Sequence, residues 1–77
     1  MKNPVFFANN KEQVIFIYHI YDKSLLQIAK IEGSGTTILN IPPNSHIAVK
    51  KGTLIGEFMV PIETIFETRL LKNHYQL

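Results

Sequence analysis

The side chains that most often carry out chemistry are few and widely separated in this sequence. The three histidines, His19, His46 and His74, share no ligand spacing, and the chain has no cysteine, which excludes disulfides and thiolate zinc sites. Asp22 is the only aspartate, and no Gly-x-Ser-x-Gly motif or phosphate loop is present. We therefore expect a non-enzymatic protein without a metal ion or a cofactor.

His46 stands in the segment IPPNSHIAV, residues 41–49. This segment resembles the part of a cupin barrel in which a Pro-x-Gly bend precedes a metal-binding histidine. Asn44 stands where the cupin bend has glycine, and the first cupin motif, His-x-His followed by Glu, has no counterpart. The resemblance implies a cupin-like barrel that binds a small ligand, with His46 at the mouth of its pocket.

Composition indicates a single small domain, residues 1–77, that needs help from a partner. Apolar residues make up 45% of the chain and charged residues 18%, below the usual quarter. A domain this short has a thin core, and without disulfides or metals its usual supplement is oligomerisation. No signal peptide or membrane-spanning run is visible, so we expect a cytoplasmic protein without a membrane partner.

The first two expected strands differ in their surroundings. Pro4–Ala8 is predicted as a short edge strand, because a proline at its start costs no hydrogen bond there. Gln13–Tyr21, which is β-branched and aromatic on both faces, is predicted as a central strand. We expect a neighbouring molecule to cover the face that the chain cannot cover itself.

The middle of the chain is predicted as a series of hairpins. Residues 22–32 fit a strand, which we favour, or a helix that begins with the capping box Ser24-Leu25-Leu26-Gln27. Gly33-Ser34-Gly35 would then join this strand to Thr36–Ile41 as a tight hairpin, and Pro42-Pro43 ends that second strand. Lys50-Lys51-Gly52 is predicted as the turn between strands at His46–Val49 and Thr53–Phe58.

The last third of the chain changes period. Ile62, Ile65, Phe66 and Leu70 follow the i, i+3, i+4, i+8 spacing of an amphipathic helix over Pro61–Asn73. The predicted fold is therefore mainly β, an antiparallel meander or open barrel of five or six short strands with a C-terminal amphipathic helix. An α+β fold is the alternative if residues 22–32 are helical.

These elements favour a protein-protein interaction module that forms homo-oligomers or binds another protein as its inhibitor or regulator. The predicted contact residues lie on the edge strand and the helix: Val5, Phe6, Phe7, Ile62, Ile65, Phe66, Arg69 and Leu70. The net charge of +2 also permits a nucleic-acid-binding β-barrel, in which lysines contact phosphates beside exposed aromatic side chains. The residues of this alternative are Lys23, Lys30, Lys50 and Lys51.

Overall fold

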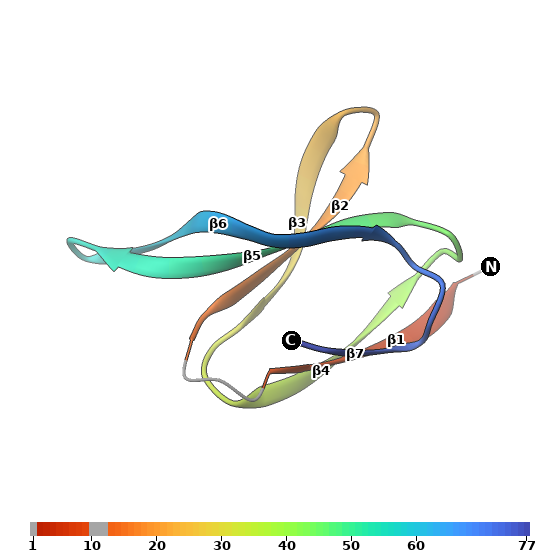
Figure 1. Cartoon of the computed structure of the whole chain (residues 1–77), viewed down its shortest axis with the longest axis horizontal. Helices are drawn as coiled ribbons and strands as arrows, with labels where there is room; N and C mark the ends of the chain where they lie inside the picture. The colour runs from red at the N-terminus through yellow and green to blue at the C-terminus, as the bar shows by residue number, and fades with distance from the viewer. Residues whose placement is uncertain (1, 10–12) are drawn as a thin grey trace.

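The computed structural model describes residues 2–9 and 13–77, and every regular element in these ranges is a β-strand (Figure 1). The strands are β1 (Asn3–Asn9), β2 (Ile15–Tyr21), β3 (Ser24–Ile31), β4 (Gly35–Ile41), β5 (His46–Ile55), β6 (Phe58–Arg69) and β7 (His74–Gln76). Within the described ranges there is no helix of the length and apolarity that a membrane crossing requires. The chain is a small all-β domain.

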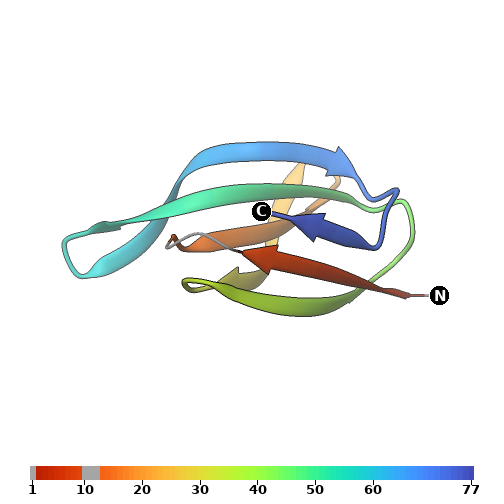
Figure 2. The same cartoon turned by 60° about the horizontal axis from the view of Figure 1, so that its bottom comes forward.

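The seven strands form two open sheets that face each other (Figure 2). Sheet A has the strand order β4-β1-β7, and sheet B has the order β3-β2-β5-β6. All neighbours are antiparallel except β1 and β7, which run parallel. The prediction of a β-dominated domain is confirmed, but the two sheets do not close into a barrel.

The core lies between the two sheets. Its largest fully buried apolar side chains come from β1, β2 and β5: Phe7, Ile15, Ile17, Ile47 and Val49. The Tyr75 ring stacks on Phe7 at 5.6 Å between ring centroids. The Tyr75 hydroxyl accepts hydrogen bonds from the backbone N–H groups of Leu71 and Lys72, at 3.2 and 3.3 Å, and so fixes the turn between β6 and β7.

Two strand predictions are confirmed. β2 is a central strand between β3 and β5, and residues 24–31 form a strand rather than a helix. Asp22 and Lys23 both have positive φ, 50° and 67°, as a two-residue type I′ hairpin turn requires. The chain itself covers both faces of β2 at Ile15, Phe16 and Ile17, so the expectation that a neighbour covers one face there is wrong.

The two predicted glycine hairpins are both wrong. β3 and β4 belong to different sheets, so Gly33-Ser34-Gly35 carries the chain from one sheet to the other. β5 continues through Lys50-Lys51-Gly52, and the turn falls at Gly56-Glu57, where Gly56 has φ 61°. Gly52 lies against the Phe16 ring instead, so close that a Cβ atom at residue 52 would be 2.5 Å from Phe16 Cε2.

The predicted C-terminal helix is also wrong, because residues 58–69 form the edge strand β6. Val49 pairs with Phe66 and Lys50 with Thr64, which leaves Ile65 as an extra residue in a β-bulge. A second bulge leaves Ile62 without a partner opposite β5. Each bulge adds one residue to the alternation of a strand, so apolar residues recur at spacings of three and four and imitate a helix.

The strand that was predicted at an edge, Pro4–Ala8, is instead a central strand. β1 lies in the centre of sheet A, between β4 and β7, and Val5 and Phe7 are buried. The strand-ending role of the two prolines is confirmed, since β4 ends at Ile41. The bend that follows is closed by Ser45, whose hydroxyl donates to the carbonyl of Pro42 at 2.7 Å.

Candidate interaction surface

The far end of the β5–β6 hairpin extends beyond the rest of the domain (Figure 1). β2 pairs with β5 only as far as Lys51, and the last bond between them joins Gly52 N–H to the Val14 carbonyl. Residues 53–62 therefore form a two-stranded ribbon, which we call the β5–β6 arm. An isolated two-stranded ribbon is at best marginally stable in water, so this arm gains stability from any surface that covers it.

The β5–β6 arm is apolar and exposed on both faces. Leu54 pairs with Met59 on one face, and Ile55 pairs with Phe58 on the other, because alternate residues of a strand point to opposite sides. The exposed fractions are 63% for Leu54, 59% for Ile55 and 73% for Phe58. Glu57, at the turn, is the only charged residue among residues 53–62. An exposed apolar group of this kind is typical of an interaction site.

A smaller apolar group lies at the end of the β2–β3 hairpin, which projects in a different direction from the β5–β6 arm (Figure 1). Tyr21, Leu25 and Leu26 are exposed there beside the charged turn residues Asp22 and Lys23. The charged turn makes this hairpin end less suited to complete burial than the β5–β6 arm.

The contact residues predicted from sequence are divided by the fold. Val5, Phe7 and Leu70 are buried in the core and have no free surface. Two further aromatic residues are held by ring contacts: Phe6 meets His74 edge-on at 5.1 Å, and Phe66 stacks on Tyr75 at 6.5 Å.

Three predicted contact residues remain exposed on β6: Ile62, Ile65 and Arg69. Ile62 belongs to the β5–β6 arm, whereas Ile65 and Arg69 lie further along the strand. Sequence reasoning missed Leu54, Ile55 and Phe58. The sequence feature that could have indicated them is the run TLIGEFMVPI, residues 53–62, which contains a single charged residue.

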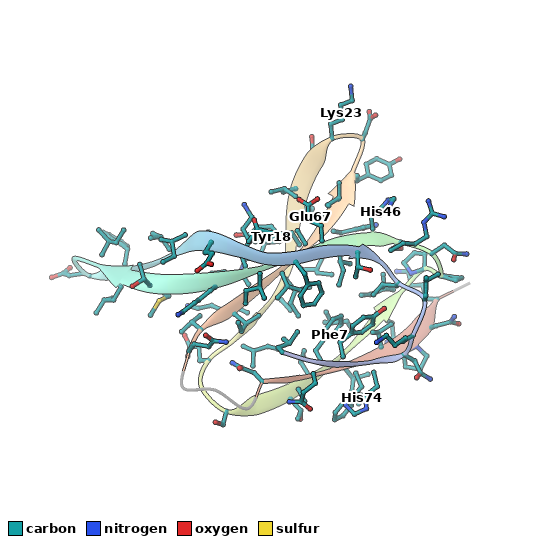
Figure 3. The ribbon with its side chains drawn as sticks, viewed as in Figure 1. Phe7, Tyr18, Lys23, His46, Glu67 and His74 are labelled. Carbon is teal, nitrogen blue, oxygen red and sulfur yellow. The ribbon has the colours of Figure 1, made fainter. Side chains whose placement is uncertain are left out.

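The four lysines of the nucleic-acid alternative do not share one surface. Lys30 and Lys50 both pair with Phe16 and lie on the outer face of sheet B, where their Nζ atoms approach the Phe16 and Tyr18 rings to 5.9 and 5.5 Å. Lys51 points to the opposite face of β5, and Lys23 lies at the tip of the β2–β3 hairpin (Figure 3).

The aromatic side chains of that outer face are largely covered. Phe16 is only 4% exposed, which leaves little ring surface for a stacked base. Burial raises the pKa of the Tyr18 hydroxyl above its ordinary value of 10.0. Lys30 forms an ion pair with Glu32 at 3.0 Å, and this pair reduces the positive charge available to phosphates.

The histidines are as separate in space as in sequence. His46 begins β5 in sheet B and His74 begins β7 in sheet A (Figure 3), while His19 lies within β2. Among residues 2–9 and 13–77, no group of three His, Asp or Glu side chains could hold a metal ion. The exposed His46 therefore has no described ligand set around it of the kind that a cupin metal site needs.

Comparisons with protein-family models, with curated proteins and with solved structures found no match. The fold and the surface together describe a small all-β domain with one exposed apolar arm.

Proposed function

We propose that this protein is a non-enzymatic protein-interaction module that associates with a second copy of itself through the β5–β6 arm. The observation that carries this proposal is the exposure of Leu54, Ile55 and Phe58 on a ribbon that no other strand within residues 2–9 and 13–77 supports. Burial of such side chains is the main favourable term in protein association.

A second copy suits the arm because the arm offers apolar surface and almost no charge. A charged partner would find only Glu57 to pair with, whereas another arm presents the same uncharged side chains. In a two-fold contact the same patch is used twice, so every favourable contact is doubled.

Side-chain packing is the favoured mode of contact, rather than addition of a strand to the edge of β6. Pro61 has no N–H to donate, and the bulges at Ile62 and Ile65 twist the free edge. Both features are ones that natural proteins use to block edge-to-edge pairing. The apolar faces of the arm are left as the contact.

Sedimentation velocity over a wide concentration range tests this proposal. We expect a concentration-dependent dimer for the natural sequence and a monomer for Leu54→Ser. Leu71→Ser is the matched control, because Leu71 is also exposed, at 78% against 63% for Leu54, but lies outside the arm. A natural sequence that stays monomeric at the highest concentration would reject self-association. A Leu71→Ser variant that dissociates as readily as Leu54→Ser would reject the arm as the contact.

Binding of single-stranded nucleic acid is a second candidate function. It is supported by Lys30 and Lys50, which lie on the same outer face of sheet B, with their Nζ atoms 5.9 Å from the Phe16 ring and 5.5 Å from the Tyr18 ring. Fluorescence anisotropy with a labelled oligonucleotide at low salt tests it. We expect the Lys30→Ala, Lys50→Ala double variant to bind more weakly and with a smaller salt dependence than the control pair Lys23→Ala, Lys72→Ala. Equal losses in both pairs would mean that the charge alone, and not this face, attracts the nucleic acid.

A further inference from the structure

A cleft lies between β2 and β3 of sheet B and the end of β4 in sheet A, and residues of both sheets line it. The cavity has a volume of about 370 Å³. Known small-molecule sites have volumes of about 300–1,000 Å³, so the cleft is large enough to hold a ligand.

The floor of the cleft is apolar and its rim is polar. Ile28, Leu39 and Ile41 form the floor. Ile28 is the extra residue of a bulge in β3, because Ile17 pairs with Ala29 and Tyr18 with Gln27. The rim carries Lys2 and His19, and no described residue of the lining is acidic. Asn40 also lines the cleft, but its side chain lies on the face of β4 opposite to Leu39 and Ile41.

His19 is in an unusual position for a histidine. It follows Ile17 on the face of β2 that builds the core, and it lies where that core ends and the cleft begins. No hydrogen bond joins its partly buried ring to any residue in the part of the chain that the structure describes, and its ring contact there is with Tyr21 at 6.2 Å. Among the described residues no buried side-chain nitrogen or oxygen lacks a hydrogen-bond partner, so the ring nitrogens of His19 face solvent, where a ligand can reach them.

Lys2 adds a positive charge at the same rim. Within residues 2–9 and 13–77 the only ion pair joins Lys30 to Glu32, so no described carboxylate neutralises Lys2. A basic rim above an apolar floor matches a molecule with a negatively charged head and an apolar body.

We propose that this cleft binds a small organic anion with an apolar body, of which a medium-chain carboxylate is the simplest example. Its carboxylate accepts hydrogen bonds from the Lys2 ammonium and an N–H of the His19 ring. Its hydrocarbon chain lies against Ile28 and Leu39. This site is separate from the β5–β6 arm, and it adds a ligand to a protein whose proposed role is association.

An NMR titration of the full chain with sodium octanoate, and with 1-octanol as the neutral analogue, tests the proposal. We expect saturable shifts of backbone signals in β2 and β4 with octanoate, and about tenfold weaker binding of octanol, because charge-assisted hydrogen bonds are lost. His19→Leu and Lys2→Gln should each remove most of this difference. His46→Leu and Lys50→Gln are the matched controls and should retain it.

Three results would overturn this proposal. They are binding of octanol as tight as that of octanoate, octanoate shifts at residues 53–62 rather than at the cleft, and a titration that does not saturate. Lys2 is exposed, so Lys2→Gln keeps the fold and gives a decisive result even where His19→Leu destabilises the chain. Phe58→Ser, which affects only the arm, should leave octanoate binding unchanged, and this separates the cleft from self-association.

Discussion

Replacing Gly52 by alanine tests the central packing feature of sheet B. A Cβ atom at residue 52 would lie 2.5 Å from Phe16 Cε2, 3.2 Å from Phe16 Cδ2 and 3.3 Å from the carbonyl oxygen of Val60. The first of these distances is far below van der Waals contact. Since the Val60 oxygen belongs to the backbone, the Phe16 ring is the group that must move.

The expected cost follows from what the ring loses when it moves. Phe16 is only 4% exposed, so a displaced ring leaves a packed position and exposes apolar surface. Overpacking of this kind lowers the free energy of unfolding by about 1–3 kcal/mol. For a domain of this size that corresponds to a fall in melting temperature of roughly 5–20 °C.

A double-mutant cycle with Phe16→Leu isolates the contact. The measurement is urea unfolding, followed by circular dichroism, of the natural sequence, Gly52→Ala, Phe16→Leu and the double variant. We expect the double variant to be more stable than the sum of the single effects predicts, by about 1 kcal/mol or more, because the smaller side chain makes room for the new methyl group.

Gly56→Ala is the matched control. Gly56 has φ 61° and open space around the position of a Cβ atom, so alanine there costs about 1 kcal/mol through backbone strain alone. Its effect should add to that of Phe16→Leu without coupling. If Gly52→Ala behaves in the same way, additive with Phe16→Leu, then Gly52 acts through its backbone conformation and the packing argument is refuted.

Three further predictions concern association, the core and pH. Phe58→Ser should raise the dissociation constant of the dimer about 10²–10⁴-fold, because each of two copies loses about 1.5–3 kcal/mol of apolar burial; sedimentation equilibrium measures this, and an unchanged constant contradicts it. Tyr75→Phe should lower the free energy of unfolding by about 1–2 kcal/mol in urea, since the backbone N–H groups of Leu71 and Lys72 lose their acceptor; an equally stable variant would show that these bonds contribute little. The raised pKa of Tyr18 means that the folded state holds this proton more tightly than the unfolded state, so the stabilisation is complete below pH 10 and is lost as the pH rises through the folded-state pKa. Denaturation at alkaline pH should therefore be less steep in Tyr18→Phe, and identical pH profiles would contradict the assignment.

The local sequence pattern predicted β2 and several strand ends correctly. The run IFIYHIY of β2 is β-branched and aromatic, and it forms the central strand that its composition predicts. The residues Asp22-Lys23 and Pro42-Pro43 also mark real strand ends. At these places the local preference of the backbone and the tertiary structure agree.

Prediction failed where tertiary contacts give a residue a role that its type does not reveal. Glycine at residue 52 suggests a turn in the sequence. In the structure it is explained by the Phe16 ring, 36 positions earlier in the chain, which leaves no room for a side chain there. The bulges at Ile62 and Ile65 depend on pairing with β5, and no local rule shows them. The later alternation of Phe66, Thr68 and Leu70 does have the period of a strand and was the available evidence against a helix.

The candidate site was predictable only in its general chemistry. The low charge and high apolar content indicated an exposed apolar surface, and the structure has one. Its position at residues 53–62 depends on where β2 stops pairing with β5, which is a property of the whole sheet. The juxtaposition of Lys2 with His19 likewise depends on how the two sheets pack and is invisible in the sequence.

The parallel pairing of β1 with β7 has a consequence for the order in which the molecule acquires its structure. Phe6 N–H bonds to the Asn73 carbonyl and Leu77 N–H to that of Ala8, so strands from opposite ends of the sequence must meet before sheet A is complete. Contacts of such long sequence separation slow folding, typically to milliseconds or seconds. During synthesis one side of β1 therefore stays unpaired until β7 has left the ribosome, and an unpaired strand edge is a template for aggregation.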